Sequence, residues 1–413
     1  MKYKTNSLNC LADIQTGPFG SQLHNEDYVL EGTPIVTVEH LGEKNFKQQN
    51  LPYVSDADKE RLSKYVLKPG DIVFSRVGSV DRCSYVSAKY DGWLFSGRCL
   101  RVRPNETLDP QYLYYYFCAE ETKQFVRNIA VGATMPSINT ALLGQVQISY
   151  PDIITQKKIA AILSALDEKI ATNRAINDNL FEQIRTLCTA WLSDYEPFDG
   201  VIPYDWVETP LSDIAEFISG YSYKGAELTD STIAMATIKN FDRKGGFKLD
   251  GYKEIIPSSK LKESQHAELF DTLVAHTDLT QNAEVIGNAE PVMSKLGYDD
   301  IVFSMDLVKV LPKKESVSKF LIAAILQDKK FKAHCLGYVN GTTVLHLSKK
   351  ALPEYKLFLP SDLSKLRPLD EVVTALYRQI SSNISENTYL EELRESLLPK
   401  LMSGELDVSA VEL

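Results

Sequence analysis

The two halves of the sequence resemble each other, and this repeat limits the folds that the chain can adopt. The stretch GATMPSINTALLGQVQISYPD at residues 132–152 returns at residues 341–362 as GTTVLHLSKKALPEYKLFLPSD. The offset, 341 − 132 = 209, is about half of the 413 residues. Shorter echoes at offsets of about 200 to 210 link ADIQTGPFGS to AEFISGYSYKG, GDIVFSRVGS to FDTLVAHTDLTQ and FSGRCLRVRP to FSMDLVKVLP. A repeat on this scale predicts two blocks built on one framework.

Each block mixes strands and helices. Runs rich in β-branched and aromatic residues, bounded by Gly, Pro or Asp, predict strands, and they include DIVFSRV, CLRVRP, TLVAH and IVFSMDLVKVLP. The segments DPQYLYYYFCAEETKQFVRNI and SVSKFLIAAILQDKKFKAHC predict helices. The expected fold class is therefore α+β, with two pseudo-symmetric domains.

A helix with a regular apolar seam follows each block. In the first helix the seam residues alternate at spacings of four and three, as in a coiled coil, at Ile159, Leu163, Leu166, Ile170, Asn173, Asn177, Leu180, Ile184 and Leu187. The second helix repeats this pattern 210 residues later, with Asn383 and Asn387 in its middle. Antiparallel packing would bring Asn173 and Asn177 against Asn387 and Asn383, and paired amides penalise slipped registers. The alternative is that these residues mark a solvated stretch or a kink.

The chain order predicts how the parts are arranged. A helix over residues 155–191 would be roughly 55 Å long at 1.5 Å per residue. Two such helices, running antiparallel, would separate the two domains and relate them by a pseudo-two-fold axis, which suits the reading of a linear ligand at two places. The expected limits are 1–152 for the first block, 153–195 for the first helix, 196–362 for the second block and 363–413 for the second helix and tail.

The charge is unevenly distributed along the chain. The net charge is −10, but residues 1–150 hold 16 basic and 16 acidic residues, and residues 206–360 hold 19 and 20. Residues 151–205 hold 5 and 9, and residues 361–413 hold 5 and 10. If the ligand is DNA, phosphate attraction favours the two balanced blocks as its binding surface. The acidic helices would then face another partner.

The sequence predicts no catalytic or metal site. It has no phosphate-binding loop, HExxH or GxSxG motif, and its six cysteines and six histidines lack metal-ligand spacing. The tetrapeptide NLPY at residues 50–53 differs by one residue from the NPPY motif of adenine N6-methyltransferases, and DEK at residues 167–169 is interpreted as a solvated helix face. With no apolar run of signal-peptide or membrane-spanning type, a cytoplasmic protein is expected.

Several motifs together resemble a known family. TGPFGSQL near the start, KPGDIVFSRVGS in the first block, GATMPSIN followed by YPD and QKKIAAILSALDEKI at the block-helix junction, and LLPKLMSGEL near the end are similar to the specificity subunit of type I restriction-modification systems. The resemblance covers residues 8–406. It implies that each block is a target recognition domain for one half of a split double-stranded DNA site, and that the helices are spacers that dock the methyltransferase subunits.

The resemblance also implies which partners carry out the chemistry. Two methyltransferase subunits, and two motor-nuclease subunits in the full complex, would bind S-adenosylmethionine, ATP and Mg²⁺, while this chain binds no cofactor. Two other classes of function stay open: an adenine N6-methyltransferase built around NLPY, and a coiled-coil scaffold that joins two protein-binding modules.

The candidate DNA contacts of the first block are polar or basic residues on loops bounded by glycine. Major-groove base edges are read by such side chains, and arginine is the commonest partner of guanine. The candidates are Gly17, Phe19, Ser21, Gln22, His40, Arg76, Ser79, Arg82, Arg98, Arg101, Thr134, Ser137 and Asn139. The loop 17–22 is as readily a plain turn. Arg98, Arg101 and Arg103 are expected on one face of a strand, which either meets phosphate or is a solvated sheet surface.

The second block keeps the framework and changes these side chains. Its candidates are Tyr221, Tyr223, Lys224, Lys239, Asn240, Arg243, Lys244, His276, Thr280, Gln281, Asn282, Thr343 and His346. Part of the segment 239–248 is alternatively a solvated hairpin. A shared scaffold with unlike polar tips predicts that the two half-sites differ in sequence, so the whole site would be asymmetric.

Overall fold

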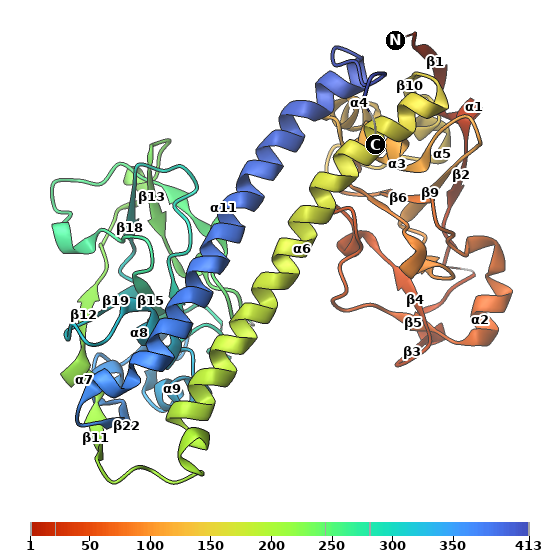
Figure 1. Ribbon diagram of the computed structural model, residues 1–413. Coiled ribbons are helices and arrows are strands. Elements are labelled where there is room, and N and C mark those ends of the chain that lie inside the picture. The colour runs from red at the N-terminus through yellow and green to blue at the C-terminus, as the bar shows by residue number, and fades with distance from the viewer. Residues whose placement is uncertain (1, 21, 244, 281, 412–413) are drawn as a thin grey trace. The chain divides into compact units, whose positions relative to one another are not determined.

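The computed structural model describes residues 2–20, 22–243, 245–280 and 282–411 of the chain. It divides into two compact units. Unit 1 comprises Met1–Lys169 and Leu390–Leu413, and unit 2 comprises Ile170–Tyr389. The long helices α6 (Ile153–Leu192) and α11 (Arg367–Ser403) are each shared between the units. Each unit therefore holds one α+β domain and a segment of both helices (Figure 1).

The domain of unit 1 is built on a four-stranded antiparallel sheet. Its strand order is β2-β9-β6-β7, with bounds β2 (Ala12–Thr16), β6 (Ile72–Ser75), β7 (Cys83–Tyr85) and β9 (Cys99–Pro104). Leu100 of β9 shares a buried core with Leu113 of α3 (Pro110–Cys118) and Val126 of α4 (Glu120–Ile129). Because β9 lies inside this sheet, between β2 and β6, the loops before and after it start from fixed positions.

Smaller elements complete the domain of unit 1. A second sheet has the order β3-β5-β4-β8, in which β4 and β8 run parallel; the strands are β3 (Tyr28–Val29), β4 (Thr33–Val36), β5 (Tyr53–Val54) and β8 (Leu94–Phe95). An antiparallel pair joins β1 (Lys4–Ser7) to β10 (Gln147–Tyr150). The short helices are α1 (Leu8–Leu11), α2 (Asp56–Arg61) and α5 (Thr140–Leu143).

Unit 2 repeats this plan. Its main sheet has the order β12-β19-β15-β17 and its second sheet the order β14-β13-β18. The strands are β11 (Trp206–Pro210), β12 (Ala215–Ser219), β13 (Ile233–Ala236), β14 (Lys253–Glu254), β15 (Thr272–Ala275), β16 (Thr277–Asp278), β17 (Ala289–Pro291), β18 (Asp300–Phe303), β19 (Leu307–Pro312), β20 (Val339–Asn340), β21 (Leu345–Leu347) and β22 (Lys356–Pro360). The helices are α7 (Leu211–Ile214), α8 (Lys319–Leu326), α9 (Lys329–Leu336) and α10 (Ala351–Glu354). The predicted α+β duplication is confirmed.

The repeated stretch takes the same backbone conformation in both units. Gly132 and Gly341, 209 residues apart, have left-handed φ values of 106° and 109°. A Cβ atom at Gly132 would lie 2.7 Å from the Met135 carbonyl oxygen, and one at Gly341 would lie 2.3 Å from that of Val344. Glycine is retained in both copies because the loop folds back on itself at this point.

The predicted helices and strands are present, with two differences. Each predicted helix between the sheet and the repeated stretch is two helices, α3 and α4 in unit 1 and α8 and α9 in unit 2. The first break falls at Ala119, whose ψ of 134° is extended, and the second at Asp328, whose side chain accepts from the Lys330 amide and starts α9. The run IVFSMDLVKVLP contains two strands, β18 and β19, joined by a turn.

The Asn residues of the two seams pair with each other within unit 2. The Asn173 amide donates to Asn387 Oδ1 at 3.0 Å, and the Asn383 amide donates to Asn177 Oδ1 at 2.7 Å. All four side chains are at least nine-tenths buried. The predicted antiparallel register is confirmed, and the alternative of a solvated stretch is excluded. A slip along the seam would leave buried amides unpaired, so these pairs fix the register.

The interpretation of Asp167 as part of a solvated face is wrong. Within unit 1 its side chain is 11% exposed and accepts a hydrogen bond from Arg394 of α11 at 2.7 Å. The Tyr115 hydroxyl donates to the same carboxylate at 2.5 Å, and Lys44 Nζ lies 3.8 Å away. Asp167 therefore connects the domain of unit 1 to its segments of both long helices.

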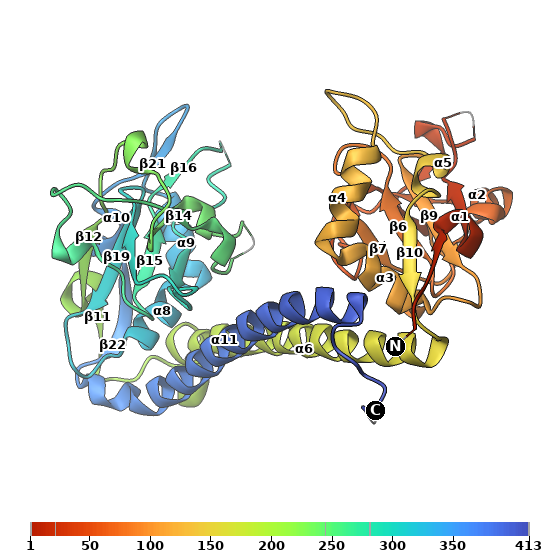
Figure 2. The same cartoon turned by 90° about the horizontal axis from the view of Figure 1, so that it is seen from above.

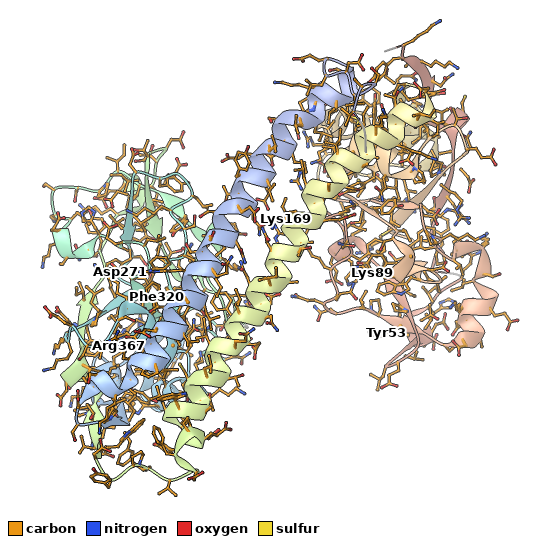
Figure 3. All side chains as sticks on the ribbon, viewed as in Figure 1. Tyr53, Lys89, Lys169, Asp271, Phe320 and Arg367 are labelled. Carbon is orange, nitrogen blue, oxygen red and sulfur yellow. The ribbon has the colours of Figure 1, made fainter. Side chains whose placement is uncertain are left out.

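The domain of unit 2 is joined to its helix segments by aromatic packing instead. Phe320 of α8 is labelled in Figure 3. Its ring lies 4.8 Å from that of Phe270 and 5.9 Å from that of Tyr377 on α11. Tyr377 is fully buried and donates to Gln327 Oε1 at 3.0 Å. Tyr377 stands 210 residues after Asp167, so the two units use unlike chemistry at equivalent places.

Among the described helices, none combines the length and apolar character needed to cross a membrane.

Candidate nucleic-acid interface

Four loops of unit 1 are tied together where β2 and β6 end and β9 begins. The Gly17 amide donates to the Cys99 carbonyl at 3.2 Å, and the Arg76 amide donates to the Arg98 carbonyl at 2.8 Å. The Arg76 carbonyl in turn accepts from the Ile138 amide at 2.9 Å. Residues 17–22, 76–82, 96–98 and 130–139 are named edge 1.

The same bonds tie the equivalent loops of unit 2. The Gly220 amide donates to Leu307 at 3.2 Å, and the His276 amide donates to Asp306 at 2.8 Å. The His276 carbonyl accepts from the Leu347 amide at 2.8 Å. Residues 220–224, 276–288, 304–306 and 339–347 are named edge 2. The two edges share these backbone ties, so Arg76 matches His276.

In each unit taken by itself, the edge lies away from the long helices. Figure 2 shows the loop between α4 and α5 projecting from unit 1 on the side opposite to that unit's segment of α6. The loop that leads into β21 projects from unit 2 in the same manner (Figure 2). Each domain thus has one surface formed by loop tips and another that packs on helix.

Two glycines allow the first loop of each edge to pass close to the sheet. A Cβ atom on Gly17 would lie 2.1 Å from the Ser96 carbonyl oxygen, and one on Gly220 would lie 2.0 Å from that of Ser304. Real Cβ atoms do not approach backbone oxygen so closely, which requires glycine at both places. Gly17 itself is buried, so its role as a candidate contact is limited to shaping the loop.

Arg76 is the cation that edge 1 holds most firmly. Its guanidinium lies 5.2 Å from the centre of the Phe19 ring and its Nη1 donates to the Gly97 carbonyl at 3.2 Å. A cation over an aromatic face and a single carbonyl contact leave the remaining guanidinium donors available. These donors match the two acceptors that guanine presents in the major groove.

The other candidates of edge 1 divide by exposure. Phe19 is 52% exposed, and the exposed candidates also include Ser79, Arg98, Thr134 and Asn139. Gln22, Arg82 and Ser137 are half-buried. Gln22 Oε1 accepts from the Tyr65 hydroxyl at 2.6 Å, and the Arg82 guanidinium packs against Gly42. Those two side chains are therefore occupied within the protein.

His40 and Asn240 are not surface residues. Both side chains are fully buried. His40 stabilises a short turn in unit 1, and Asn240, 200 residues later, stabilises the equivalent turn in unit 2. His40 Nδ1 accepts from the Thr37 amide at 2.9 Å, and Asn240 Oδ1 accepts from the Thr237 amide at 2.8 Å. Their other polar atoms bond backbone carbonyls nine and eight residues later. Burial removes both predicted contacts from the candidate interface.

Arg101 and Tyr221 are also internal. Arg101 is 3% exposed and its guanidinium pairs with Asp13. Tyr221 is 2% exposed and its hydroxyl donates to Glu227 at 2.9 Å. Their polar atoms hold neighbouring segments together, so neither is available to DNA.

The three arginines expected on one strand face do not share it. Arg98 lies before β9, in the loop of edge 1, because the strand begins only at Cys99. Arg101 points into unit 1, and Arg103 makes two bonds of 2.6 and 2.7 Å to the buried carboxylate of Asp71. Arg98 remains a candidate contact because it lies in the loop, whereas Arg101 and Arg103 are paired with Asp13 and Asp71 within unit 1.

The described candidates of edge 2 and its neighbouring loop are mostly accessible. Lys224, Lys239, Arg243, Asn282, Thr343 and His346 are exposed, and Tyr223, His276 and Thr280 are half-buried. Lys239 and Arg243 belong to the adjacent loop 239–248 rather than to edge 2, and Arg243 pairs with Glu284 at 3.1 Å. Ser21, Lys244 and Gln281 lie outside the described residues.

His276 differs from Arg76 in charge as well as in shape. Burial, followed by the charges of His346 and Lys349, lowers the pKa of His276. A neutral imidazole at neutral pH offers one donor and one acceptor, whereas a guanidinium offers only donors. Equivalent places on the two edges therefore favour different hydrogen-bond patterns.

Some residues at the edges were not predicted. Met135, Leu279 and Met305 are 66%, 68% and 56% exposed, and they place apolar groups among the polar tips. Apolar side chains contact the methyl group of thymine. The Asp306 carboxylate stands where edge 1 has Arg98. The repeat offsets could have identified these places, but not their exposure.

The described residues around NLPY form part of a sheet. The NLPY segment ends in β5, and the Pro52 carbonyl accepts from the Ile35 amide at 2.9 Å inside the second sheet. Within the described ranges, no group of three or more His, Cys, Asp or Glu side chains is arranged to hold a metal ion. The accessible groups of the edges are hydrogen-bonding, charged and apolar side chains.

The comparison with known proteins agrees with the geometry. Residues 2–182 match the family described as type I restriction modification DNA specificity domain. The type I restriction enzyme MjaIX specificity subunit of Methanocaldococcus jannaschii is 24% identical over 74% of this chain and 71% of its own length. The putative type I restriction enzyme MjaX specificity subunit of the same organism is 27% identical over 93% of this chain and 89% of its own.

A solved structure shares the fold. The S subunit of a type I restriction-modification system from M. genitalium superimposes with a TM-score of 0.58 at 17% identity, covering 97% of this chain and 96% of that chain. The likeness extends over both units, whereas the family match covers the first unit's domain and most of α6. The chain is thus similar in sequence to type I restriction enzyme specificity subunits, and similar in fold to one solved S subunit.

Proposed function

We propose that this chain reads one asymmetric, two-part DNA site, with edge 1 on one half and edge 2 on the other. The observation that carries the proposal is that the same backbone ties assemble two loop edges whose side chains differ, as at Arg76 and His276. Identical backbone ties support equal placement of the two edges on DNA, and unlike side chains give each edge its own base preference.

The catalytic steps belong to partners in this proposal. Two methyltransferase subunits dock on the acidic helix segments and use S-adenosylmethionine, and two motor-nuclease subunits join the full complex with ATP and Mg²⁺. The decisive experiment is to express the chain with its methyltransferase partner and to map methylated adenines across the genome. A two-part motif with a fixed gap is expected. Methylation without a shared motif, or binding of S-adenosylmethionine by the isolated chain, would overturn the proposal.

Arg76→Ala should weaken recognition of one half-site only. The loss of a bidentate contact to guanine costs about 1 to 3 kcal/mol of discrimination. The measurement is a competition between duplexes that differ in a single half-site. His276→Ala serves as the matched variant and should alter the other half-site. Equal loss on specific and random DNA would instead identify Arg76 as a phosphate contact.

The long helices should set the gap between the half-sites. Seven extra residues in α6 and in α11 keep the seam in register and add about 10 Å at 1.5 Å per residue, or roughly three base pairs. We expect the methylated motif to gain base pairs in its gap and to keep both half-sites. A gap of unchanged length in an active complex would show that the helices do not set the distance between the half-sites.

A further inference from the structure

The loop that follows β15 is six residues longer in unit 2 than in unit 1. The Ser75 amide donates to Arg82 and the Ala275 amide donates to Asn288, both at 2.9 Å, so these positions correspond. Six residues separate Arg82 from Ser75 and twelve separate Asn288 from Ala275. Since Thr277 pairs with His346 as Val77 pairs with Ser137, the extra residues lie after Asp278. Residues 279, 280 and 282–287 are named the long loop.

A single lysine holds the base of the long loop. Lys332 of α9 donates from Nζ to Asn288 Oδ1 at 2.7 Å, to the Glu284 carbonyl at 3.0 Å and also to the Ile286 carbonyl. The carbonyl of Ala283 lies 3.5 Å from the same ammonium. An ammonium has three hydrogens to donate, and here all of them are directed at this loop and its end.

Asp278 holds the other side of the loop. Its buried carboxylate accepts from the Thr280 amide at 2.7 Å, from the Thr280 hydroxyl at 2.8 Å and from the Val285 amide at 2.9 Å. Ala283 has a left-handed φ of 51°, which costs energy in a residue with a side chain. Such a conformation persists where surrounding bonds fix it, and Lys332 and Asp278 supply those bonds.

The tip of this braced loop faces solvent. Leu279 is 68% exposed and Asn282 is exposed, while Val285 and Ile286 are buried beneath them. Leu279 offers an apolar surface suited to a thymine methyl group, and the Asn282 amide can bond an adenine edge twice. A fixed backbone lets such groups discriminate between bases, because a loose loop would adapt to any of them.

We propose that the long loop sets much of the base preference of the second half-site, and that Lys332 is the positioning residue that holds it in reading conformation. This inference rests on the proposed function. The corresponding loop of unit 1 lacks the six extra residues, so the effect is confined to one half of the DNA site.

The test is selection of bound duplexes from a pool of random double-stranded DNA by the full chain. Lys332→Met should reduce the enrichment of preferred bases in the second half-site by roughly tenfold and leave the first half-site unchanged. The matched control is Lys123→Met on α4: the Lys123 amide donates to Ala119 as the Lys332 amide donates to Asp328. This control should leave the second half-site unchanged.

A second variant distinguishes a loss of base preference from a loss of folding. Leu279→Ala combined with Asn282→Ala removes only exposed side chains, so the melting temperature should stay constant while the second half-site loses preference. If both variants keep the wild-type preference there, the long loop is not a specificity determinant. If the wild-type chain enriches no two-part sequence, the proposed function itself is wrong, and the two failures are thereby distinguished.

Discussion

Asp167→Ala should lower the free energy of unfolding of unit 1 by about 3 kcal/mol, because it leaves two partly buried cations without their counter-charge. The side chains of Asp167, Lys44 and Arg394 are 11%, 17% and 31% exposed, so solvent screens them only in part. Burial lowers the pKa of Lys44, and the charge of Asp167 opposes that shift. The Tyr115 hydroxyl also loses its acceptor.

Chemical denaturation at neutral pH measures this loss. Asp167→Asn keeps the shape and an acceptor but not the charge, and its effect should be intermediate. Glu31→Ala removes a carboxylate from an exposed loop and should change stability by less than about 0.5 kcal/mol. A loss for Asp167→Ala as small as that of the control would mean that the cluster is solvated and contributes little.

The stability of unit 2 should fall as pH rises from about 4 to about 7, because of one buried carboxyl group. Glu290 of β17 is 3% exposed, and burial raises its pKa to about 7. Bonds from the Gly246 amide at 2.7 Å and from Gln327 at 3.0 Å, and the nearby charge of Arg185, favour the ionised form but do not offset burial. Unit 1 has Ser84 at the corresponding place.

The sign follows from proton binding. An unfolded glutamate has a pKa of about 4.3, so between about pH 4 and 7 the folded chain binds more protons than the unfolded one. The contribution of Glu290 to the free energy of unfolding should therefore decrease by about 3 kcal/mol over this range and stay level on either side. Denaturation of the wild type and of Glu290→Gln across this range gives the difference. A difference that does not vary with pH would show that Glu290 titrates normally.

The sequence predicted the parts of the fold that depend on periodicity. The seam of α6 and α11 and the pairing of Asn173 with Asn387 follow from positions along a helix, which spacing alone determines. The break at Ala119 does not follow from periodicity, since alanine favours helix and the extended conformation there arises from packing. Asp167 was misjudged for a related reason: its partners Lys44 and Arg394 lie far away in sequence.

The sequence indicated which loops form the edges, but it did not indicate which of their polar side chains are accessible. Arg76 lies in the loop where the sequence placed it, Arg98 precedes the strand on which it was expected, and His40 and Arg101 are internal. A polar residue near a glycine looks the same in sequence whether it points outward or satisfies a neighbouring backbone group. Only tertiary contacts separate the two cases, and the Thr37 amide and the Asp13 carboxylate supply them here.

The ties that assemble each edge run from backbone amide to backbone carbonyl, as between Arg76 and Arg98 and between His276 and Asp306. Such bonds do not depend on the side chain at the position. Under the proposed function, exposed reading residues of one edge can therefore change without breaking these shared ties and without affecting the other edge. A new DNA specificity would then need only substitutions at such exposed positions, and the two halves of the site could diverge independently.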